Sequence, residues 1–363
     1  MRASRLAPRA LEAPQTVPMP RVIPALCLAA LVTACGSPDS NQEVREPAPL
    51  ATIGHVEAAT AGFSDIVDAD ALVEVLSEGY SWTEGPVWVA GGQYLLWSDT
   101  NSNTVYRWKE GEGASPWMTP SGYTGRVPRG GGLGSNGLAL DATGRLLLCQ
   151  QGDRQIGRLT STLDNPQPVF ETLAASYNGR RFHSPNDLAI AADGAVYFTD
   201  PPYGLAGPDA AEQTFNGVYR VAPGGEVTLL DSTLTRPNGI AFSPDGQTLY
   251  VANSDPAHAV WMAYDVMPDG GVTRGRVFAD VTAHVAKDKP GLPDGLKLDL
   301  DGRLFATGPG GVWVFDPDGT HLGTIRTDVQ TANVAFGDDG STLYLTSHMY
   351  VARIRTKTRG FGV

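Results

Sequence analysis

One pattern of residues occurs six times along the chain and constrains the fold more than any other feature. In each copy an apolar run leads to a turn whose glycine stands eight positions after the first residue, and a second apolar run follows. The pattern predicts two antiparallel strands joined by a tight turn. The copies are EGPVWVAGGQYLLWS from Glu84, NGLALDATGRLLLCQ from Asn136, NDLAIAADGAVYFTD from Asn186, NGIAFSPDGQTLYVA from Asn238, DGLKLDLDGRLFATG from Asp294 and ANVAFGDDGSTLYLT from Ala332.

The distance between copies leaves room for two more strands in each repeat. Successive copies start 52, 50, 52, 56 and 38 residues apart. The intervening sequence holds further strand-like runs, which are TVYRW, QIGRL, GVYRV, AVWMAYDV and GVWVF, and a turn and a short apolar run follow each. Four strands per repeat are typical of the blade of a β-propeller.

The last repeat is one strand short. Only MYVARIRT follows the sixth copy, whereas ALVEVLSEG, residues 71–79, resembles the fourth strand of the other repeats. Pairing the two ends in one blade would close the ring and hide its open edges. The sequence therefore predicts an all-β fold, a six-bladed β-propeller with four-stranded blades, its last blade closed by strands from both termini.

The N-terminal residues predict export and a lipid anchor. A basic residue and a short apolar run lead to Val32-Thr33-Ala34-Cys35, which is how a bacterial lipoprotein signal is built. We expect residues 1–34 to be the signal, with Met19 as an alternative start, and Cys35 to carry lipid facing the periplasm; an ordinary secretory signal is the alternative. Residues 35–62, rich in Ser, Pro, Glu and Ala, suit a flexible tether, and residues 63–363 would form the propeller.

Charge and cysteine content exclude several classes of function. The formal net charge is -12, and because residues 1–34 carry four Arg and one Glu, the mature chain would have about -15. Such a charge disfavours nucleic acid as a partner, and no obligatory protein partner is evident. After processing, Cys149 would be the one remaining cysteine, which excludes an intramolecular disulfide and a thiolate metal cluster.

The first residue of each copy is a candidate ligand for a metal ion. In a propeller these positions begin the strands that line the central channel. Glu84, Asn136, Asn186, Asn238 and Asp294 all carry a side-chain oxygen, and Ala332 is the exception. Hard oxygen donors suit Ca²⁺ or Mg²⁺. The alternative is that Asn and Asp form local turns with the backbone.

Several motifs resemble one known family, that of gluconolactonase, senescence marker protein and luciferin-regenerating enzyme, in its bacterial gluconolactonase-like branch. The motifs are EGPVW (84–88), SPNDL (184–188), DPPYG (200–204), RPNGI (236–240) and LPDGL (292–296). The resemblance implies a six-bladed propeller with a divalent cation in its channel, usually calcium, with Mg²⁺, Mn²⁺ or Zn²⁺ as other candidates. It implies that Glu84, Asn238 and Asp294 bind the metal, that Asp294 is catalytic, and that Asn186 contacts metal or substrate.

The remaining candidates are substrate contacts. We expect Asn136, Asn186, His183 and Tyr203 to bind substrate. His183 departs from the family, whose bacterial branch more often has Asn before SPND. Asp187 interrupts the run of small residues at the second position of the copies, and we interpret it as a structural acceptor that points into its blade. Ser184, His183 and Asp187 do not form a serine triad, because neighbours on an extended segment alternate sides.

The resemblance implies hydrolysis of a lactone. The metal would polarise the carbonyl, and either Asp294 or a metal-bound water would supply the base. Two alternatives stay open. Diisopropyl fluorophosphatase has the same propeller and a similar calcium site, so phosphotriester hydrolysis is one. A non-catalytic propeller that binds a ligand and holds a structural ion is the other.

Overall fold

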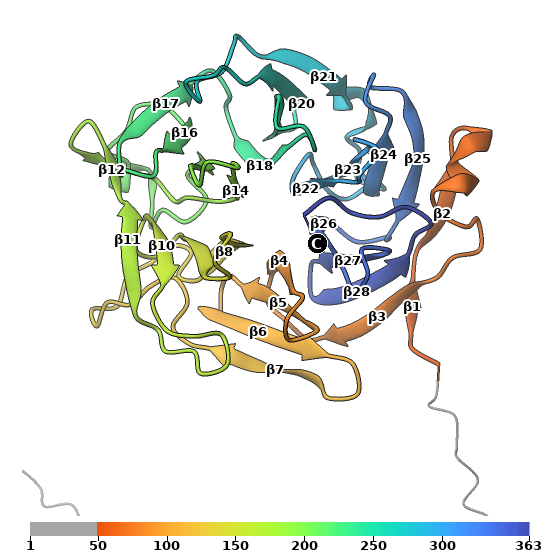
Figure 1. The fold of residues 1–363 in the computed structure, drawn as a ribbon, viewed down its shortest axis with the longest axis horizontal. Coiled ribbons are helices and arrows are strands. Elements are labelled where there is room, and N and C mark those ends of the chain that lie inside the picture. Colours follow the sequence, from red (N-terminus) through yellow and green to blue (C-terminus); the bar gives the residue numbers. More distant parts are fainter. Residues whose placement is uncertain (1–48, 363) are drawn as a thin grey trace, which may run out of the picture. The chain divides into compact units, whose positions relative to one another are not determined.

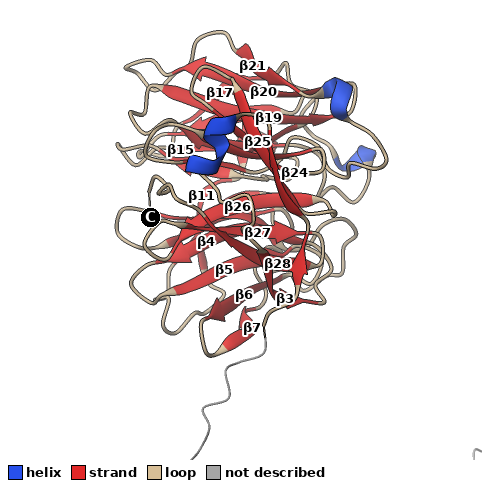
Figure 2. Cartoon of the chain, turned by 90° about the vertical axis from the view of Figure 1, so that its right-hand side faces the viewer, coloured by secondary structure: helices blue, strands red, loops and turns tan. Residues whose placement is uncertain are grey.

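The computed structural model describes residues 49–362, which form six antiparallel sheets around one axis (Figure 1). The predicted signal, Cys35 and most of the predicted tether lie outside the described residues. Apart from the sheets there are one two-stranded hairpin and three short 3-10 helices, and Figure 2 shows how little helix there is. In this range no helix is long and apolar enough to cross a membrane. The predicted six-bladed propeller is confirmed.

Each blade is numbered by its place in the sequence. Blade 1 consists of β4 (Thr83–Val89), β5 (Tyr94–Asp99), β6 (Thr104–Lys109) and β7 (Gly113–Met118). Blade 2 consists of β8 (Ser135–Leu140), β9 (Leu146–Gln150), β10 (Gln155–Leu159) and β11 (Phe170–Ala174). Blade 3 consists of β14 (Leu188–Ile190), β15 (Val196–Asp200), β16 (Gly217–Val221) and β17 (Val227–Asp231).

The other three blades follow the same order. Blade 4 consists of β18 (Pro237–Phe242), β19 (Thr248–Asp255), β20 (His258–Asp265) and β21 (Arg276–Asp280). Blade 5 contains β22 (Leu296–Leu298), β23 (Leu304–Gly308), β24 (Gly311–Phe315) and β25 (His321–Arg326). Blade 6 contains β26 (Thr331–Gly337), β27 (Thr342–Ser347) and β28 (Tyr350–Arg355). The hairpin is β12 (Ser176–Tyr177) with β13 (Arg180–Arg181), and the helices are η1 (Ala61–Asp65), η2 (Pro208–Ala210) and η3 (Thr282–His284).

Blade 6 is closed by a strand from the N-terminal end of the described chain. β3 (Val73–Glu78) pairs antiparallel with β28, with Ala352 opposite Val75 and Arg353 opposite Glu74. Figure 1 shows this segment beside the last strands of the chain. Closure by both ends is therefore confirmed, and it removes the exposed edges of an open array.

Two further strands lie in the segment predicted to be a tether. β1 (Thr52–Ile53) pairs with β3, and β2 (His55–Ala58) pairs with β25, so blades 5 and 6 have five strands rather than four. In addition η1 places Phe63 at the junction of these blades, where its ring is fully buried and packs against Gly323. The ordered body thus begins before Phe63. β1 and β2 are too short to show apolar alternation in the sequence. They form strands because they pair with β3 and β25.

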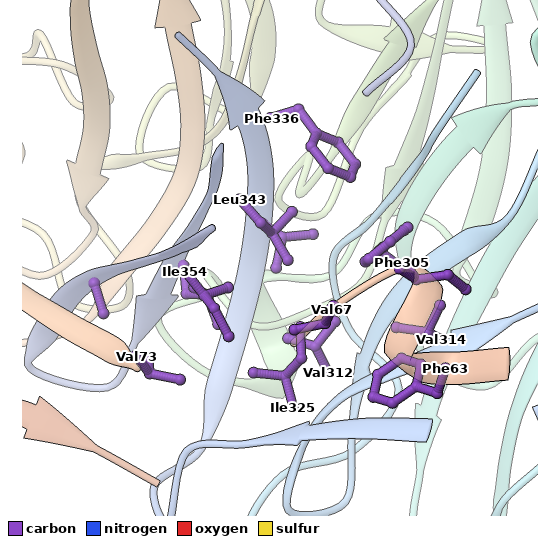
Figure 3. Close-up of a cluster of buried hydrophobic side chains, with 14 of the residues drawn as sticks. Phe63, Val67, Val73, Phe305, Val312, Val314, Ile325, Phe336, Leu343 and Ile354 are labelled. Carbon is purple, nitrogen blue, oxygen red and sulfur yellow. The ribbon is translucent and has the colours of Figure 1, made fainter. Parts of the chain in front are cut away.

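Buried apolar side chains fill the space between neighbouring blades. The cluster between blades 5 and 6 contains Phe63, Val312, Ile325, Phe336 and Ile354 (Figure 3). Comparable clusters join blades 4 and 5 and blades 2 and 3. The hydrophobic core is therefore divided into separate clusters, each between two neighbouring blades.

The hairpin turns between the first two strands of the blades follow the predicted glycine pattern in five copies. Gly144, Gly194, Gly246, Gly302 and Gly340 have positive φ angles, from 70° to 91°, a region that glycine enters at little cost. In the first copy Gly92 does not, and Gln93 takes the positive φ of 52° instead. The turn of blade 1 therefore places its left-handed residue one position later.

Candidate metal centre and active site

Residues at or just before the start of five of the six inner strands line a cavity of about 390 Å³. All five predicted oxygen-bearing residues line it. Each is buried, with at most 7% of its surface exposed; they are Glu84, Asn136, Asn186, Asn238 and Asp294. Residues up to 210 positions apart in the sequence thus meet at one axis, as the repeat alignment predicts.

Irregular pairing at the head of the inner strands turns these side chains toward the axis. The register shifts between Glu84 and Val87 in blade 1, and between Pro237 and Ile240 in blade 4. Such bulges release one or two residues from the regular alternation and redirect their side chains. In blade 3 the same effect arises because β14 begins after Asn186.

Hydroxyl groups of adjacent blades fix the backbone at these positions. Ser98 in blade 1 donates to the carbonyl of Asn136 at 2.9 Å, and Thr199 in blade 3 donates to that of Asn238 at 2.6 Å. Each bond joins the second strand of one blade to the inner strand of the next. Because the donors and acceptors are buried, these bonds hold the ring in register at the cavity.

The amides contact one another, and Glu84 contacts its own blade. The Asn186 amide Nδ2 donates to Asn238 Oδ1 at 2.5 Å. Glu84 Oε2 accepts from the backbone N–H of Gly85 at 3.1 Å, and Glu84 Oε1 accepts from Trp82 Nε1 at 3.5 Å. These bonds fix both the carboxylate and the amides before any ligand binds.

Two oxygen atoms of the site are buried without a hydrogen-bond partner. They are Oδ1 of Asn186 and Oδ1 of Asp294. A buried polar atom without a partner costs about 1–3 kcal/mol, so buried groups are nearly always satisfied. Two such acceptors in one cavity indicate that a positively charged or hydrogen-bonding ligand belongs between them.

The carboxyl groups of the site are difficult to ionise in the protein alone. Burial raises the pKa of Glu84 to about 7, and the negative charge of Asp187 adds to the rise. Burial, with the charges of Glu84 and Asp187, raises the pKa of Asp294 well above its ordinary value. A cation among them would favour the charged forms by opposite charge. The electrostatics therefore point to the same ligand as the unpartnered oxygens.

The residue that follows the first position of each copy belongs to a layer around the axis next to the cavity, which we call the floor. Four of these residues are glycine (Gly85, Gly137, Gly239 and Gly295), and the other two are Asp187 and Asn333. Asn333 Nδ2 donates across the axis to Asp187 Oδ2 at 3.4 Å. A Cβ at Gly137 would lie 2.6 Å from Asp187 Oδ1, and one at Gly295 would overlap Asn333. Glycines thus leave the space that two side chains occupy.

This floor corrects the interpretation of Asp187. The Asp187 carboxylate is a hydrogen-bond acceptor, as predicted: Oδ1 accepts from the N–H of Leu188 at 2.9 Å. It points toward the axis, however, rather than into its blade. In blade 6 the first position is Ala332, which has no polar side chain, and the polar side chain belongs to the following residue, Asn333, as it does to Asp187 in blade 3.

The donor set suits a hard divalent cation. Two carboxylates and two or three amide oxygens are typical ligands of Ca²⁺, with Mg²⁺ as the smaller alternative. Within residues 49–362 no cluster of three or more His, Cys, Asp or Glu side chains is arranged to hold a metal. The amides are therefore essential to any cation site here. The residues that fit such a cation are Glu84, Asn186, Asn238 and Asp294.

His183 lies outside the cavity, contrary to the prediction that it contacts substrate. Its ring is buried, with Nε2 at 3.1 Å from the carbonyl of Gln213 and Nδ1 at 2.9 Å from Asn216 Oδ1. Asp200 accepts the backbone N–H groups of His183 and Ser184, each at 2.7 Å, and so fixes the direction of the segment. The His183 ring therefore contacts the loop that contains Gln213 and Asn216, and it does not face the cavity.

Ser184 takes no part in a serine triad, as predicted. Its hydroxyl donates to the carbonyl of Pro201 at 2.6 Å and accepts from the N–H of Gly204 at 2.8 Å. These bonds hold the loop that carries Tyr203, which does line the cavity and is 44% exposed. Burial of its hydroxyl, together with the negative charge of Asp294, raises the pKa of Tyr203 to about 12. The phenol therefore remains a hydrogen-bond donor at neutral pH.

Other residues of the cavity wall were not predicted as site residues. They are Trp82, Thr100, Asn101, Gly132, Gln151, Arg236, Ser254, Leu292 and Gln330. Thr100, Gln151 and Ser254 lie near the end of the second strand of their blades, 15 or 16 residues after the first residue of the copy. The repeat alignment, extended by two residues beyond each copy, would have pointed to this region.

Comparison with known proteins places this fold and site in one family. The family model described as "SMP-30/Gluconolactonase/LRE-like region" matches residues 82–349. A gluconolactonase from Zymomonas mobilis is 36% identical over 347 residues, which cover 93% of this chain and 96% of the relative. A pentonolactonase from Haloferax volcanii is 29% identical, covering 73% of this chain and 80% of the relative.

Solved structures agree with the sequence comparison. A gluconolactonase from Xanthomonas campestris superimposes with a TM-score of 0.72 at 32% identity, covering 86% of this chain and 99% of that protein. The calcium-binding protein regucalcin from Agrobacterium tumefaciens shares the fold, with a TM-score of 0.60 at 23% identity over 78% of this chain and 94% of that protein. With its propeller and its ring of inner-strand carboxylates and amides, the chain belongs to the SMP-30/gluconolactonase/LRE-like family.

Proposed function

We propose that this protein is a calcium-dependent lactonase that opens the ring of a hydroxylated lactone. The observation that carries the proposal is the buried set of Glu84, Asn186, Asn238 and Asp294, two of whose oxygens lack partners. The relatives named gluconolactonase and pentonolactonase support the reaction class. Regucalcin-type relatives support a divalent cation.

The residues of the site divide into ligands and reacting groups. Glu84, Asn186, Asn238 and Asp294 would hold the cation, which when bound supplies Lewis-acid stabilisation of negative charge on the carbonyl oxygen. Hydrolysis adds water to the carbonyl carbon and breaks the bond between that carbon and the ring oxygen. The water must lose a proton, and the ring oxygen must gain one. The protein has to supply a group for both transfers.

Asp294 is the group we assign to proton transfer. Its Oδ1 is buried in the cavity without a protein partner, so it is available to a water molecule or a substrate. As a carboxylate it accepts the proton of the attacking water, and as a carboxylic acid it returns the proton to the departing ring oxygen. A general base or acid of this kind contributes about 10²–10⁴-fold to a rate.

The cavity wall favours a polar substrate. Amide and guanidinium groups line it at Asn101, Asn136, Gln151, Arg236 and Gln330, together with the indole of Trp82. Placed donors and acceptors of this kind bind the hydroxyl groups of a sugar lactone, whereas an aliphatic lactone would leave them unpaired. Asn136 and Tyr203 remain our assignments for substrate contact, together with Asn186.

The test is turnover of a panel of lactones by the purified protein. We expect hydrolysis of sugar lactones, followed by acid release, with loss of activity after chelator and recovery with calcium. Asp294→Ala should lower kcat/KM by at least 10²-fold. As a matched control, Asp288→Ala removes an exposed carboxylate from a loop of blade 5 outside the cavity wall, and it should retain activity. Normal activity of Asp294→Ala would exclude the assigned mechanism.

The same panel separates the two alternatives. Turnover of a phosphotriester such as diisopropyl fluorophosphate, without turnover of any lactone, would favour a phosphotriesterase. A folded, calcium-binding protein that turns over no ester, lactone or phosphotriester would favour a ligand-binding propeller with a structural ion. Either result would replace the lactonase proposal.

We also propose that Cys35 carries a lipid and holds the enzyme at a bacterial membrane, facing the periplasm. The proposal rests on the sequence Val32-Thr33-Ala34-Cys35 after an apolar run. Full-length protein should fractionate with membranes, and Cys35→Ala should release it to the soluble fraction. An unchanged distribution of Cys35→Ala would contradict the lipid anchor.

A further inference from the structure

Ser254 lies beside the candidate ligands at the end of β19, and its hydroxyl connects two of them. The residue is buried, 5% exposed, and lines the cavity. Asn238 Nδ2 lies 2.9 Å from Ser254 Oγ, and the Ser254 hydroxyl also contacts the carbonyl of Pro293. Pro293 directly precedes Asp294, so the hydroxyl joins the inner strand of blade 4 to the ligand segment of blade 5.

The direction of these hydrogen bonds follows from their chemistry. A carbonyl oxygen can only accept, so the Ser254 hydroxyl must donate its one proton to Pro293. The hydroxyl oxygen can then only accept from Asn238, which must therefore present its NH₂ group to Ser254. This places Oδ1 of Asn238 on the opposite side, next to the amide of Asn186.

The same logic continues to Asn186. Because Oδ1 of Asn238 is an acceptor, Asn186 must present its NH₂ group to it, across 2.5 Å. The oxygen of Asn186 then faces away from this bond, and it is one of the two buried oxygens without a partner. One hydroxyl thus determines the orientation of both amides, and it leaves the oxygen of Asn186 free for a cation. The oxygen and nitrogen of an amide have nearly the same shape, so packing alone would not decide this.

We infer that Ser254 is a positioning residue of the metal site, one that orients the amides of Asn238 and Asn186 so that oxygen, and not NH₂, faces the cation. The inference rests on the proposed function, since it assumes that a cation binds here. Without the hydroxyl, Asn238 can rotate its amide by a half turn. Its NH₂ group would then face the cation and repel it.

Terbium, a luminescent substitute for calcium, gives a readout that does not require turnover. Trp82 lies 3.5 Å from Glu84 Oε1, close enough to sensitise a bound ion, and calcium titration against terbium gives the calcium affinity. We expect Ser254→Ala to weaken binding by about 10–100-fold, the usual effect of removing a group that orients a metal ligand. Ser254→Thr keeps the hydroxyl and should restore most of the affinity.

A matched control and a second background separate orientation from packing. Ser347→Ala removes another buried serine hydroxyl, which bonds Thr331 Oγ1 at 3.0 Å and touches no amide of the site, so it should bind terbium normally. Asn238→Asp replaces the amide by a carboxylate, whose two oxygens are equivalent. In that background Ser254→Ala should cost little affinity. If Ser254→Ala fails to fold, Ser254→Cys, which keeps the volume with a weak donor, takes its place.

The outcomes distinguish this inference from the proposed function. If the unaltered protein binds neither terbium nor calcium, the metal site itself is absent and both fall. If it binds them and Ser254→Ala binds equally well, only the role of Ser254 is overturned. An equal loss from Ser254→Ala in the unaltered protein and in the Asn238→Asp variant would also overturn it, because the hydroxyl would then act through packing and not through the orientation of an amide.

Discussion

The residues that we propose to carry the chemistry lie at the axis, and the protein holds them in states that are unfavourable without a ligand. Glu84 and Asp294 are buried, and among residues 49–362 neither forms an ion pair with a basic side chain. The sequence identified both through their place in the repeat. It also identified the three amides. Which atoms would remain without partners depended on the contacts between side chains.

The raised pKa of Glu84 predicts how calcium affinity depends on pH. With a pKa of about 7 in the metal-free protein, the carboxyl group is largely protonated below pH 7 and must lose its proton to bind calcium. Affinity should therefore fall as the pH drops from 8 to 6, and calcium binding at pH 6 should release protons. Calorimetry in buffers of different ionisation enthalpy measures both. Affinity that is constant over this range would contradict the burial of an uncompensated carboxyl group.

The glycine layer below the site predicts a steric effect. In Gly137→Ala the new Cβ would lie 2.6 Å from Asp187 Oδ1 and 2.8 Å from Asp187 Cα, and the backbone atom cannot move freely. We expect a loss of about 1–3 kcal/mol in the free energy of unfolding, as for other overpacked interiors. Urea denaturation measures it.

Gly224 provides the matched control for this change. A Cβ at Gly224 would meet nothing within 4 Å, and its φ is not positive. Gly224→Ala should leave stability unchanged or raise it slightly. Equal stability of the Gly137 and Gly224 variants would mean that the floor of the cavity is loosely packed.

At the scale of strands, the ring depends on small departures from regular pairing. Register shifts at the head of β4, β8, β18 and β26 direct side chains to the axis. The outer edge depends instead on ordinary pairing, in which β3 completes blade 6 and β1 and β2 extend blades 6 and 5. The inner strands therefore determine the geometry of the site, and the outer strands contribute to the stability of the closed ring.

Two neighbouring residues of β3 test what the closing strand contributes. Val73 is buried, 1% exposed, in the cluster between blades 5 and 6, so Val73→Ala should cost about 2 kcal/mol of unfolding free energy. Glu74 faces outward, 37% exposed, and pairs with Arg353 at 2.8 Å. Glu74→Gln should cost less than about 1 kcal/mol, as exposed ion pairs do. The opposite order in urea denaturation would show that the closing strand is held by charge rather than by apolar packing.

At the scale of the whole molecule, the proposed cation site would join blades that are far apart in the sequence. The ligands come from blades 1, 3, 4 and 5, and the protein has a net charge of -12. An ion that binds the closed ring, and not the unfolded chain, stabilises the ring by mass action. Ligand binding and the integrity of the propeller are thus coupled.

Removal of calcium should therefore lower the stability of the whole propeller. At a free calcium concentration of 100 times Kd, binding adds about 2.7 kcal/mol to the free energy of unfolding. We expect Tm to fall by several degrees after chelation and to recover with calcium. Glu84→Gln, which weakens the site, should show little calcium dependence. If chelator leaves the Tm of the unaltered protein unchanged, that result would argue against a cation bridging the blades.

The sequence by itself determined the number of blades, a closing strand within residues 71–79 and the set of oxygen-bearing residues at the axis. These follow from local patterns, namely apolar alternation, turn glycines and repeat length, that neighbouring residues decide. The tertiary structure alone decided which way His183 and Asp187 face, that Asn333 rather than Ala332 is the polar residue of blade 6, and that residues 52–58 form strands. The reason is that these features depend on contacts between distant segments: Asn333 meets Asp187 across 146 positions, and β2 pairs with β25 at the far end of the chain. No local pattern can encode a partner that only the closed ring brings near.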